Sequence, residues 1–300
     1  MKKILLLFRY KGIGYKGIGY RGIRHTNQMP LYLYTIYLFF VLLISCEKRA
    51  DWTLHSENKN LIIVDGTITS EKKEHNIKLT FPVTQLNETP QPVTGATVII
   101  SDEDSIYPLT EQPANSGIYV RKFIGCAGKH YTLLINYNNN VYSAKTTMLA
   151  GINFQPLLYA KNKNNNLYHI TWVANVYNAQ NFAMWEILLD WSNVAGYQNQ
   201  NPDSCKARVL CYTLPTIDVS QVLPPEIQNI SFPAGTVITE RRYSLTSEYA
   251  EFIRALLSET NWQGGLFDSA HGNLPTNLSE GAAGFFAACG VISLSLTVIP

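Results

Sequence analysis

The chain has 300 residues, of which 46% are hydrophobic and 15% charged, and its formal net charge is +2. Residues 1–45 hold seven Lys and Arg and no acid, so residues 46–300 carry 17 basic against 22 acidic side chains, a formal charge of −5. This acidic body argues against a nucleic-acid-binding protein, and its length allows one large domain or two ordinary ones.

The first 45 residues have the composition of a secretory signal peptide that is removed from the mature protein. Residues 30–45 are an uncharged, mostly apolar run, shorter than the ~20 apolar residues that a membrane-spanning helix usually needs. Every charged residue before this run is basic, as in the leader of an exported protein. The repeat KGIGYKGIGYRGIR at 11–24 is low-complexity sequence and is left out of the fold prediction.

The apolar run ends in Leu43-Ile44-Ser45-Cys46 and is followed at once by charged residues. This ending resembles the bacterial lipobox, which implies that the chain is cut before Cys46 and that the Cys46 thiol carries acyl chains such as palmitate. Two or more acyl chains hold a protein stably at a membrane, whereas one chain gives only marginal anchoring. We therefore predict that Cys46 is lipidated and that residues 46–59 are a lipid-anchored linker. The alternative is an uncleaved anchor helix with an incidental cysteine.

From residue 60 to about residue 150 the sequence predicts an independent β-sandwich of the Ig-like or transthyretin-like kind. Short segments with strand-like composition recur about every ten residues and are separated by Gly, Pro and Asn. The expected strands are 61–69, 76–81, 95–101, 116–123, 130–137 and 141–147. A hairpin loop is expected at Asn138-Asn139-Asn140, because Asn tolerates positive φ.

A second β-rich domain that carries one helix is expected over 151–300, so the predicted fold class is mainly β. Residues 160–166 are expected to form a polar loop, and the expected strands are 167–173, 182–191, 236–245 and 290–299. The segment 182–191 is apolar on both faces, which is typical of a central strand.

An amphipathic helix is predicted near 247–258, with Thr246 or Ser247 as its cap and Glu248 at its positive end. Apolar residues recur there at helical spacing and form a stripe: Tyr249, Phe252, Ile253, Leu256 and Leu257. We expect the stripe, Leu256 included, to be buried against the second sheet. A partner-binding stripe is the alternative.

Four cysteines follow Cys46, and their spacings match no zinc or redox motif. Cys205 and Cys211 lie six residues apart, which is compatible with a local disulfide in an exported protein or with two small buried side chains. Cys126 and Cys289 are expected to pack in the core.

The sequence shows no recognisable catalytic or metal-binding motif, so we expect no enzyme activity, no cofactor and no metal. The histidines are scattered without metal-ligand spacing, and no G-x-S-x-G nucleophile elbow is present. Asp102-Glu103-Asp104 lacks the ligand spacing of an EF-hand, which favours a solvated turn over a calcium site. Most aromatic rings of a β-rich protein fill its core, but Trp262 lies in a loop-like stretch and is the candidate for an exposed binding platform.

Two blocks of the chain, taken together, resemble a known family. The first runs from Pro92 to Tyr137 and begins PVTGATVIISDEDS; the second runs from Tyr243 to Ile299 and contains NWQGGLFDSAHGNLPTNL. With the lipobox, these blocks resemble the Bacteroidota lipoproteins of domain-of-unknown-function family 4249, and the likeness is weaker from about 152 to 237. The resemblance implies an outer-membrane or surface lipoprotein, often encoded beside a TonB-dependent outer-membrane receptor. It implies no catalytic or ligand residues.

The function expected from these features is that of a non-catalytic lipoprotein of the cell envelope, anchored by its lipid in the outer membrane at the periplasmic face or the cell surface. Such a protein is expected to act as an accessory or binding partner of a TonB-dependent receptor. The alternative is a structural, lipid-anchored subunit of a fimbria or adhesin, which also uses tandem sandwiches.

Overall fold

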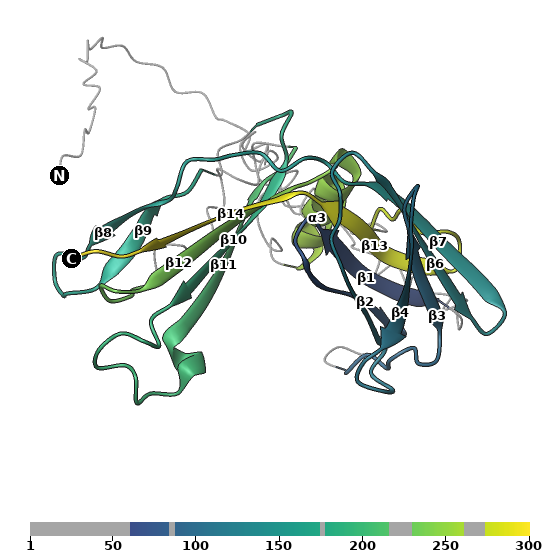
Figure 1. Ribbon diagram of the computed structural model, residues 1–300, viewed down its shortest axis with the longest axis horizontal. Coiled ribbons are helices and arrows are strands. Elements are labelled where there is room, and N and C mark those ends of the chain that lie inside the picture. The colour runs from purple at the N-terminus through teal and green to yellow at the C-terminus, as the bar shows by residue number, and fades with distance from the viewer. Residues whose placement is uncertain (1–60, 84–87, 175–177, 216–229, 261–273) are drawn as a thin grey trace, which may run out of the picture. The chain divides into compact units, whose positions relative to one another are not determined.

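The computed structural model describes residues 61–83, 88–174, 178–215, 230–260 and 274–300. Within these residues the fold is mainly β, as the sequence predicts: an eight-stranded sheet, a four-stranded sheet, a two-stranded hairpin and one α-helix (Figure 1). The eight-stranded sheet has the order β13-β1-β2-β5-β4-β3-β6-β7. Its strands are β1 (Ile62–Thr69), β2 (Lys73–Thr80), β3 (Thr97–Ser101), β4 (Ile106–Glu111), β5 (Ile118–Phe123), β6 (His130–Tyr137), β7 (Asn140–Thr147) and β13 (Ala282–Cys289).

The eight-stranded sheet encloses one hydrophobic core, to which every one of its strands contributes. Alternate residues of a strand point to the same face, so Val98 and Ile100 of β3 are buried while Thr97 is exposed. Strand β4 links two parts of the sheet, since its residues 106–109 pair with β3 and its residues 110–111 pair with β5. The result is the β-sandwich that the sequence predicts for this region.

The turn between β6 and β7 has the geometry expected from its asparagines. Tyr137 pairs with Asn140, and the two residues between them, Asn138 and Asn139, have φ angles of 48° and 61°. Positive φ at both central positions is typical of a type I′ hairpin turn, whose twist matches that of the flanking strands. The local sequence therefore fixes the register of this hairpin.

One strand of the first sandwich comes from the far end of the chain. Strand β13 pairs in parallel with β1 from Ile62–Ala282 to Thr69–Cys289, and Figure 1 shows the yellow-green β13 beside the dark blue β1. The predicted boundary at residue 150 does not hold for this strand, which was assigned to the second domain. The physical reason is that β13 is apolar on both faces: Phe286 packs in the sandwich core and Phe285 in a separate cluster on the opposite face. A strand of this kind is stable only when both of its faces are covered.

The four-stranded sheet has the order β11-β10-β12-β14, with β10 inside the sheet as its apolar faces predict. Its strands are β10 (Ala183–Asp190), β11 (Lys206–Thr213), β12 (Val237–Ser244) and β14 (Val291–Thr297). The hairpin of β8 (Leu158–Lys161) and β9 (Tyr168–Trp172) shares a core with this sheet that includes Trp185 and Phe232. The predicted polar loop at 160–166 is therefore shorter than expected, because its first two residues belong to β8.

Helix α3 spans Ser247–Thr260, close to the predicted 247–258. Ala250 and Ile253 pack in one cluster with Phe285 and Ala287 of β13, and with residues of the four-stranded sheet such as Tyr243. The apolar stripe thus lies against strands of both sheets, and not on the second sheet alone. The prediction that Leu256 is buried is wrong: the residue is 37% exposed, because it lines a hollow beside the helix.

Candidate functional site

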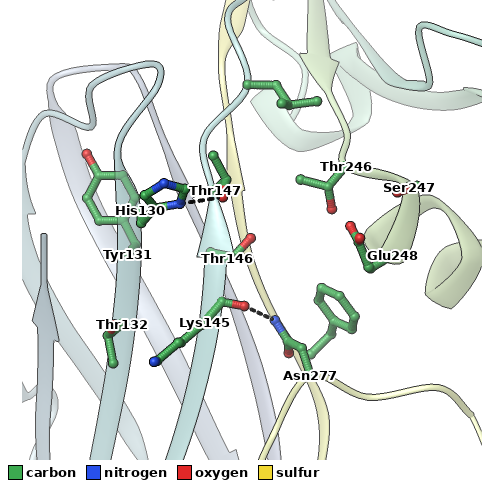
Figure 2. A pocket seen from close by; sticks show the side chains of 12 residues that line it. His130, Tyr131, Thr132, Lys145, Thr146, Thr147, Thr246, Ser247, Glu248 and Asn277 are labelled. Carbon is green, nitrogen blue, oxygen red and sulfur yellow. Dashed lines mark hydrogen bonds between the residues drawn. The ribbon is translucent and has the colours of Figure 1, made fainter.

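A pocket of about 790 Å³ lies between strands β6 and β7 and the start of helix α3. Figure 2 shows its walls: His130 and Thr132 come from β6, Lys145, Thr146 and Thr147 from β7, and Thr246, Ser247 and Glu248 from the start of α3. Phe285 and Leu149 add apolar surface. This volume falls within the range of about 300–1,000 Å³ that small-molecule sites usually have.

Asn277 lines this pocket, but its hydrogen bonds are used within the fold. Its Nδ2 donates to the Phe286 carbonyl at 2.7 Å and to the Lys145 carbonyl at 3.1 Å, and its Oδ1 accepts from the Phe286 N–H at 3.1 Å. The bond to Lys145 is drawn in Figure 2. Asn277 therefore ties β13 to β7, and we assign it a structural role.

The pair in the pocket that most resembles a nucleophile and its base is Thr147 with His130. Thr147 Oγ1 lies 2.8 Å from His130 Nδ1. The two residues are direct partners in the β6–β7 ladder, so the contact is a cross-strand pair. A hydroxyl nucleophile also needs a base that a third group orients. The nearby Glu103 accepts a hydrogen bond from the backbone N–H of His130 at 2.9 Å, and among the described residues no hydrogen bond joins it to the imidazole ring.

Glu248 places a negative charge on the opposite wall of the pocket, in the first turn of α3. A backbone hydrogen bond and the hydroxyls of Thr246 and Ser247 lower the pKa of the Glu248 carboxyl. Thr246 caps the helix as predicted, since its Oγ1 accepts from the Tyr249 N–H at 3.3 Å. The helix thus begins with its own carboxylate at its positive end. The walls offer hydroxyl groups and charges that suit binding of a small polar ligand.

A network of partly buried charges joins the β1–β2 turn to the four-stranded sheet. Arg241 of β12 donates through Nη1 to Glu186 of β10 at 2.8 Å and through Nη2 to Glu71 in the turn. Arg208 of β11 and the Tyr243 hydroxyl also donate to Glu186, at 2.7 and 2.8 Å. Burial by itself raises the pKa of Glu186, but the hydrogen bonds from Tyr243 and Arg208 outweigh it and lower the pKa below its usual range. We assign this network a structural role, because its hydrogen bonds join the β1–β2 turn to β10, β11 and β12.

Two further buried ionisable groups have shifted pKa values. Glu240 of β12 is 1% exposed, and burial raises its pKa to about 7. Its Oε2 accepts a hydrogen bond from the Leu157 N–H at 2.9 Å, and its Oε1 has no partner among the described residues. His75 of β2 is also 1% exposed, lies 4.6 Å from the Phe123 ring, and has its pKa lowered by burial to about 4. Burial, and after it the charge of Glu240, raise the pKa of the nearby Cys211 thiol, and neither Glu240 nor His75 lines the pocket.

Some of the residues singled out in the sequence cannot be placed in the fold. Cys46 and Trp262 lie outside the described residues, as do His55 and His271. Among the described residues, no helix is both long and apolar enough to span a bilayer.

Of the two alternatives that the sequence leaves open for Cys205 and Cys211, the structure has no disulfide: both thiols are free and buried. Cys205 directly precedes β11 and Cys211 lies within it. Six residues of extended strand span roughly 20 Å, far beyond the approximately 7 Å limit between the Cα atoms of a disulfide. The structure therefore agrees with the other alternative, two small buried side chains. Cys289 is buried as expected, but Cys126 is exposed, because it lies in the loop between β5 and β6.

The acidic run at 102–104 forms a turn held by its own neighbours. Asp102 Oδ1 accepts from the N–H groups of Asp104 and Ser105 at 2.8 and 2.9 Å, and Lys129 pairs with both Asp102 and Asp104. Across the described part of the chain, no group of three or more His, Cys, Asp or Glu side chains is arranged to hold a metal ion. The carboxylates of Asp102 and Asp104 are engaged by the turn itself and by Lys129.

A comparison with known protein families shows which family the chain belongs to. The model of DUF4249, a domain of unknown function, matches residues 48–295. The chain belongs to this family. The match spans both sheets and confirms the family resemblance seen in the sequence.

Other comparisons give little more about this DUF4249 protein. No curated protein matches the chain. Among solved structures, a match is found to the FN1–FN3 domains of chicken CNTN1, at 13% identity and a TM-score of 0.27. That match covers 61% of this chain and 60% of the chicken chain. A likeness at this level says nothing about function.

Proposed function

We propose that this DUF4249 protein is a lipid-anchored binding protein of the cell envelope, attached to the outer membrane through Cys46 and working with a TonB-dependent receptor. The observation that carries the proposal is the leader: an apolar run that ends in a lipobox-like Leu43-Ile44-Ser45-Cys46, about fifteen residues before the described fold begins at Leu61. A short linker of this length holds the folded body close to the membrane.

The shape of the described body supports binding in preference to chemistry. A β-sandwich offers loops and concave surfaces for recognition and does not itself specify a reaction. The pocket between β6, β7 and α3 has the volume of a ligand site and polar side chains that can orient a ligand. In its hydroxyl–imidazole pair, Thr147 with His130, no third group among the described residues is hydrogen-bonded to the imidazole.

The anchor is tested by replacing Cys46 with alanine. The variant should accumulate as a longer, unprocessed precursor and should lose labelling by a fatty-acid probe. A variant that is processed and labelled like the wild-type protein would remove the basis of the proposed location.

The partnership is tested by recovering the anchored wild-type protein from gently solubilised outer membrane and identifying what comes with it. A TonB-dependent receptor in amounts comparable to the bait supports the proposal, with the Cys46→Ala variant as the control. Recovery of fimbrial subunits instead would replace the proposal with the structural alternative.

A further inference from the structure

A second hollow, of about 770 Å³, lies beside helix α3, and its walls are mostly apolar. We call it the α3 groove. Its described lining comes from Leu61 and the start of β1, from α3, from Leu274 and Thr276 before β13, from β13 itself, and from β10 and β11 of the other sheet. Asp65 is the only charged residue among the described lining residues. The α3 groove thus differs in chemistry from the hydroxyl-lined pocket at the start of the same helix.

The α3 groove explains why the apolar stripe of the helix is incompletely covered. Leu256 is 37% exposed, and Phe252 and Leu257 are half-buried, yet all three line the groove. Tyr212 of β11 and Met184 of β10 face the same hollow from the other sheet. A contiguous exposed apolar surface is uncommon on a soluble body and marks a site for an apolar partner.

We propose that the α3 groove holds an acyl chain of the lipid on Cys46. The inference rests on the proposed lipidation of Cys46. Leu61, the described residue nearest to Cys46 in the chain, lines the groove. Fourteen residues lie between Cys46 and Leu61, and an extended chain of that length spans up to about 50 Å, so the lipid can reach the groove.

The chemistry of the walls selects an aliphatic occupant. An acyl chain needs no hydrogen-bond partner, and the lining offers it side chains such as Leu61, Ile63, Phe252 and Leu256. A polar ligand buried against these side chains would lose its hydrogen bonds to water without replacement. A chain held in the groove is shielded from water whenever the protein is not inserted in a bilayer, for example on its way to the outer membrane.

The class of ligand is tested with the mature chain, residues 46–300, carrying Cys46→Ser so that the groove is free. Residues 56–300 form one compact unit, so this chain keeps every described element. The fluorescent fatty acid cis-parinaric acid should bind saturably at one site. Leu256→Asp should weaken this binding at least tenfold. The matched control is Leu134→Asp: Leu134 is 40% exposed on β6 and lies outside the groove, so binding should not change.

Circular dichroism should show that both variants keep the fold. No saturable binding to the parent chain, or equal binding by the Leu256 and Leu134 variants, would overturn the proposal while leaving the anchor at Cys46 intact. If Leu256→Asp does not fold, Leu256→Ser replaces it with the same expected direction of change.

The source of the chain is tested with protein lipidated in cells that are fed a photoreactive, diazirine-bearing fatty acid. The lipidated protein is purified into an amphipathic polymer and irradiated. Crosslinks within the same molecule, to peptides of α3 or to the peptide that contains Tyr212, support the proposal. Labelled protein whose crosslinks all lie elsewhere would show that the acyl chain does not occupy the groove. Protein without any label would instead refute the lipidation of Cys46, and with it the proposed occupant.

Discussion

Replacing Gly284 with alanine should destabilise the first sandwich far more than replacing Gly128. Both glycines have positive φ, +98° and +85°, which L side chains rarely adopt. They differ in what an added Cβ would meet. At Gly284 it would lie 2.1 Å from the carbonyl oxygen of Val64 in β1, whereas at Gly128 it would meet nothing within 4 Å.

The two costs can be separated by magnitude. An unfavourable backbone conformation costs about 1–3 kcal/mol in either variant. The collision at Gly284 involves backbone of both strands, so no rotamer change can relieve it, and β13 must move away from β1. If two ladder hydrogen bonds are lost at about 0.5–1.5 kcal/mol each, Gly284→Ala costs roughly 1–3 kcal/mol more than Gly128→Ala. That difference is a large share of a domain's usual stability of about 5–15 kcal/mol.

Urea unfolding followed by far-UV circular dichroism measures the difference, and amide hydrogen exchange locates it. Exchange in β1 should accelerate in Gly284→Ala and stay near the wild-type rate in Gly128→Ala. Tryptophan fluorescence gives a separate reading of the other sheet, where Trp185 is buried. Equal midpoints for the two variants, or unchanged exchange in β1, would refute the assignment of β13 as an integral strand of the first sandwich.

Three further predictions concern the buried charges. The pKa of His75 is about 4 in the folded protein and about 6.5 in the unfolded chain, so the free energy of unfolding should fall by up to about 3 kcal/mol as pH drops from 6.5 to 4. His75→Phe should lose this dependence in a pH series of urea midpoints. The pKa of Glu240 is raised from 4.5 to about 7 in the folded protein, so the free energy of unfolding should fall as pH rises from 4.5 to 7. In urea unfolding, Glu240→Gln should be more stable than wild type by up to about 3 kcal/mol at pH 8 and equal to it at pH 4. Arg241→Leu leaves the carboxylates of Glu71 and Glu186 without their shared partner and should cost about 3 kcal/mol in thermal or urea unfolding. The side chain of Arg208 is 59% exposed, so Arg208→Leu should cost less than about 1 kcal/mol. Equal losses would contradict the structural role of Arg241.

Local patterns in the sequence predicted much of the secondary structure. Alternation of apolar and polar residues placed β3 and β14, helical spacing placed α3, and two asparagines placed the β6–β7 turn. These features depend on residues that are neighbours in sequence, so the pattern and the structure share a cause. The same alternation puts Glu240 and Arg242 on the buried face of β12 with Ile238, a signal for buried charges that was available in the sequence.

Strands that depend on distant partners were missed. β4 contains Pro108, which lowers the expectation of a strand, and β13 reads GFFAAC, where Gly and Ala have low strand propensity. β13 becomes a strand because β1 supplies its hydrogen bonds, and because the sandwich core and helix α3 cover its two faces. None of these conditions can be read from residues 282–289 alone.

The candidate sites also combine features that follow from local sequence with features that depend on contacts between distant residues. The sequence by itself determined the lipobox-like leader, the family, the mainly β class and the cap and first turn of α3. Only the tertiary structure decided that this first turn faces β7 across a pocket and that Leu256 lines an open groove. It alone brought Glu71 to Arg241, 170 residues away in the chain. Caps, turns and signals are set by residues within a few positions of one another, whereas pockets and ion pairs form where strands from opposite ends of the chain meet.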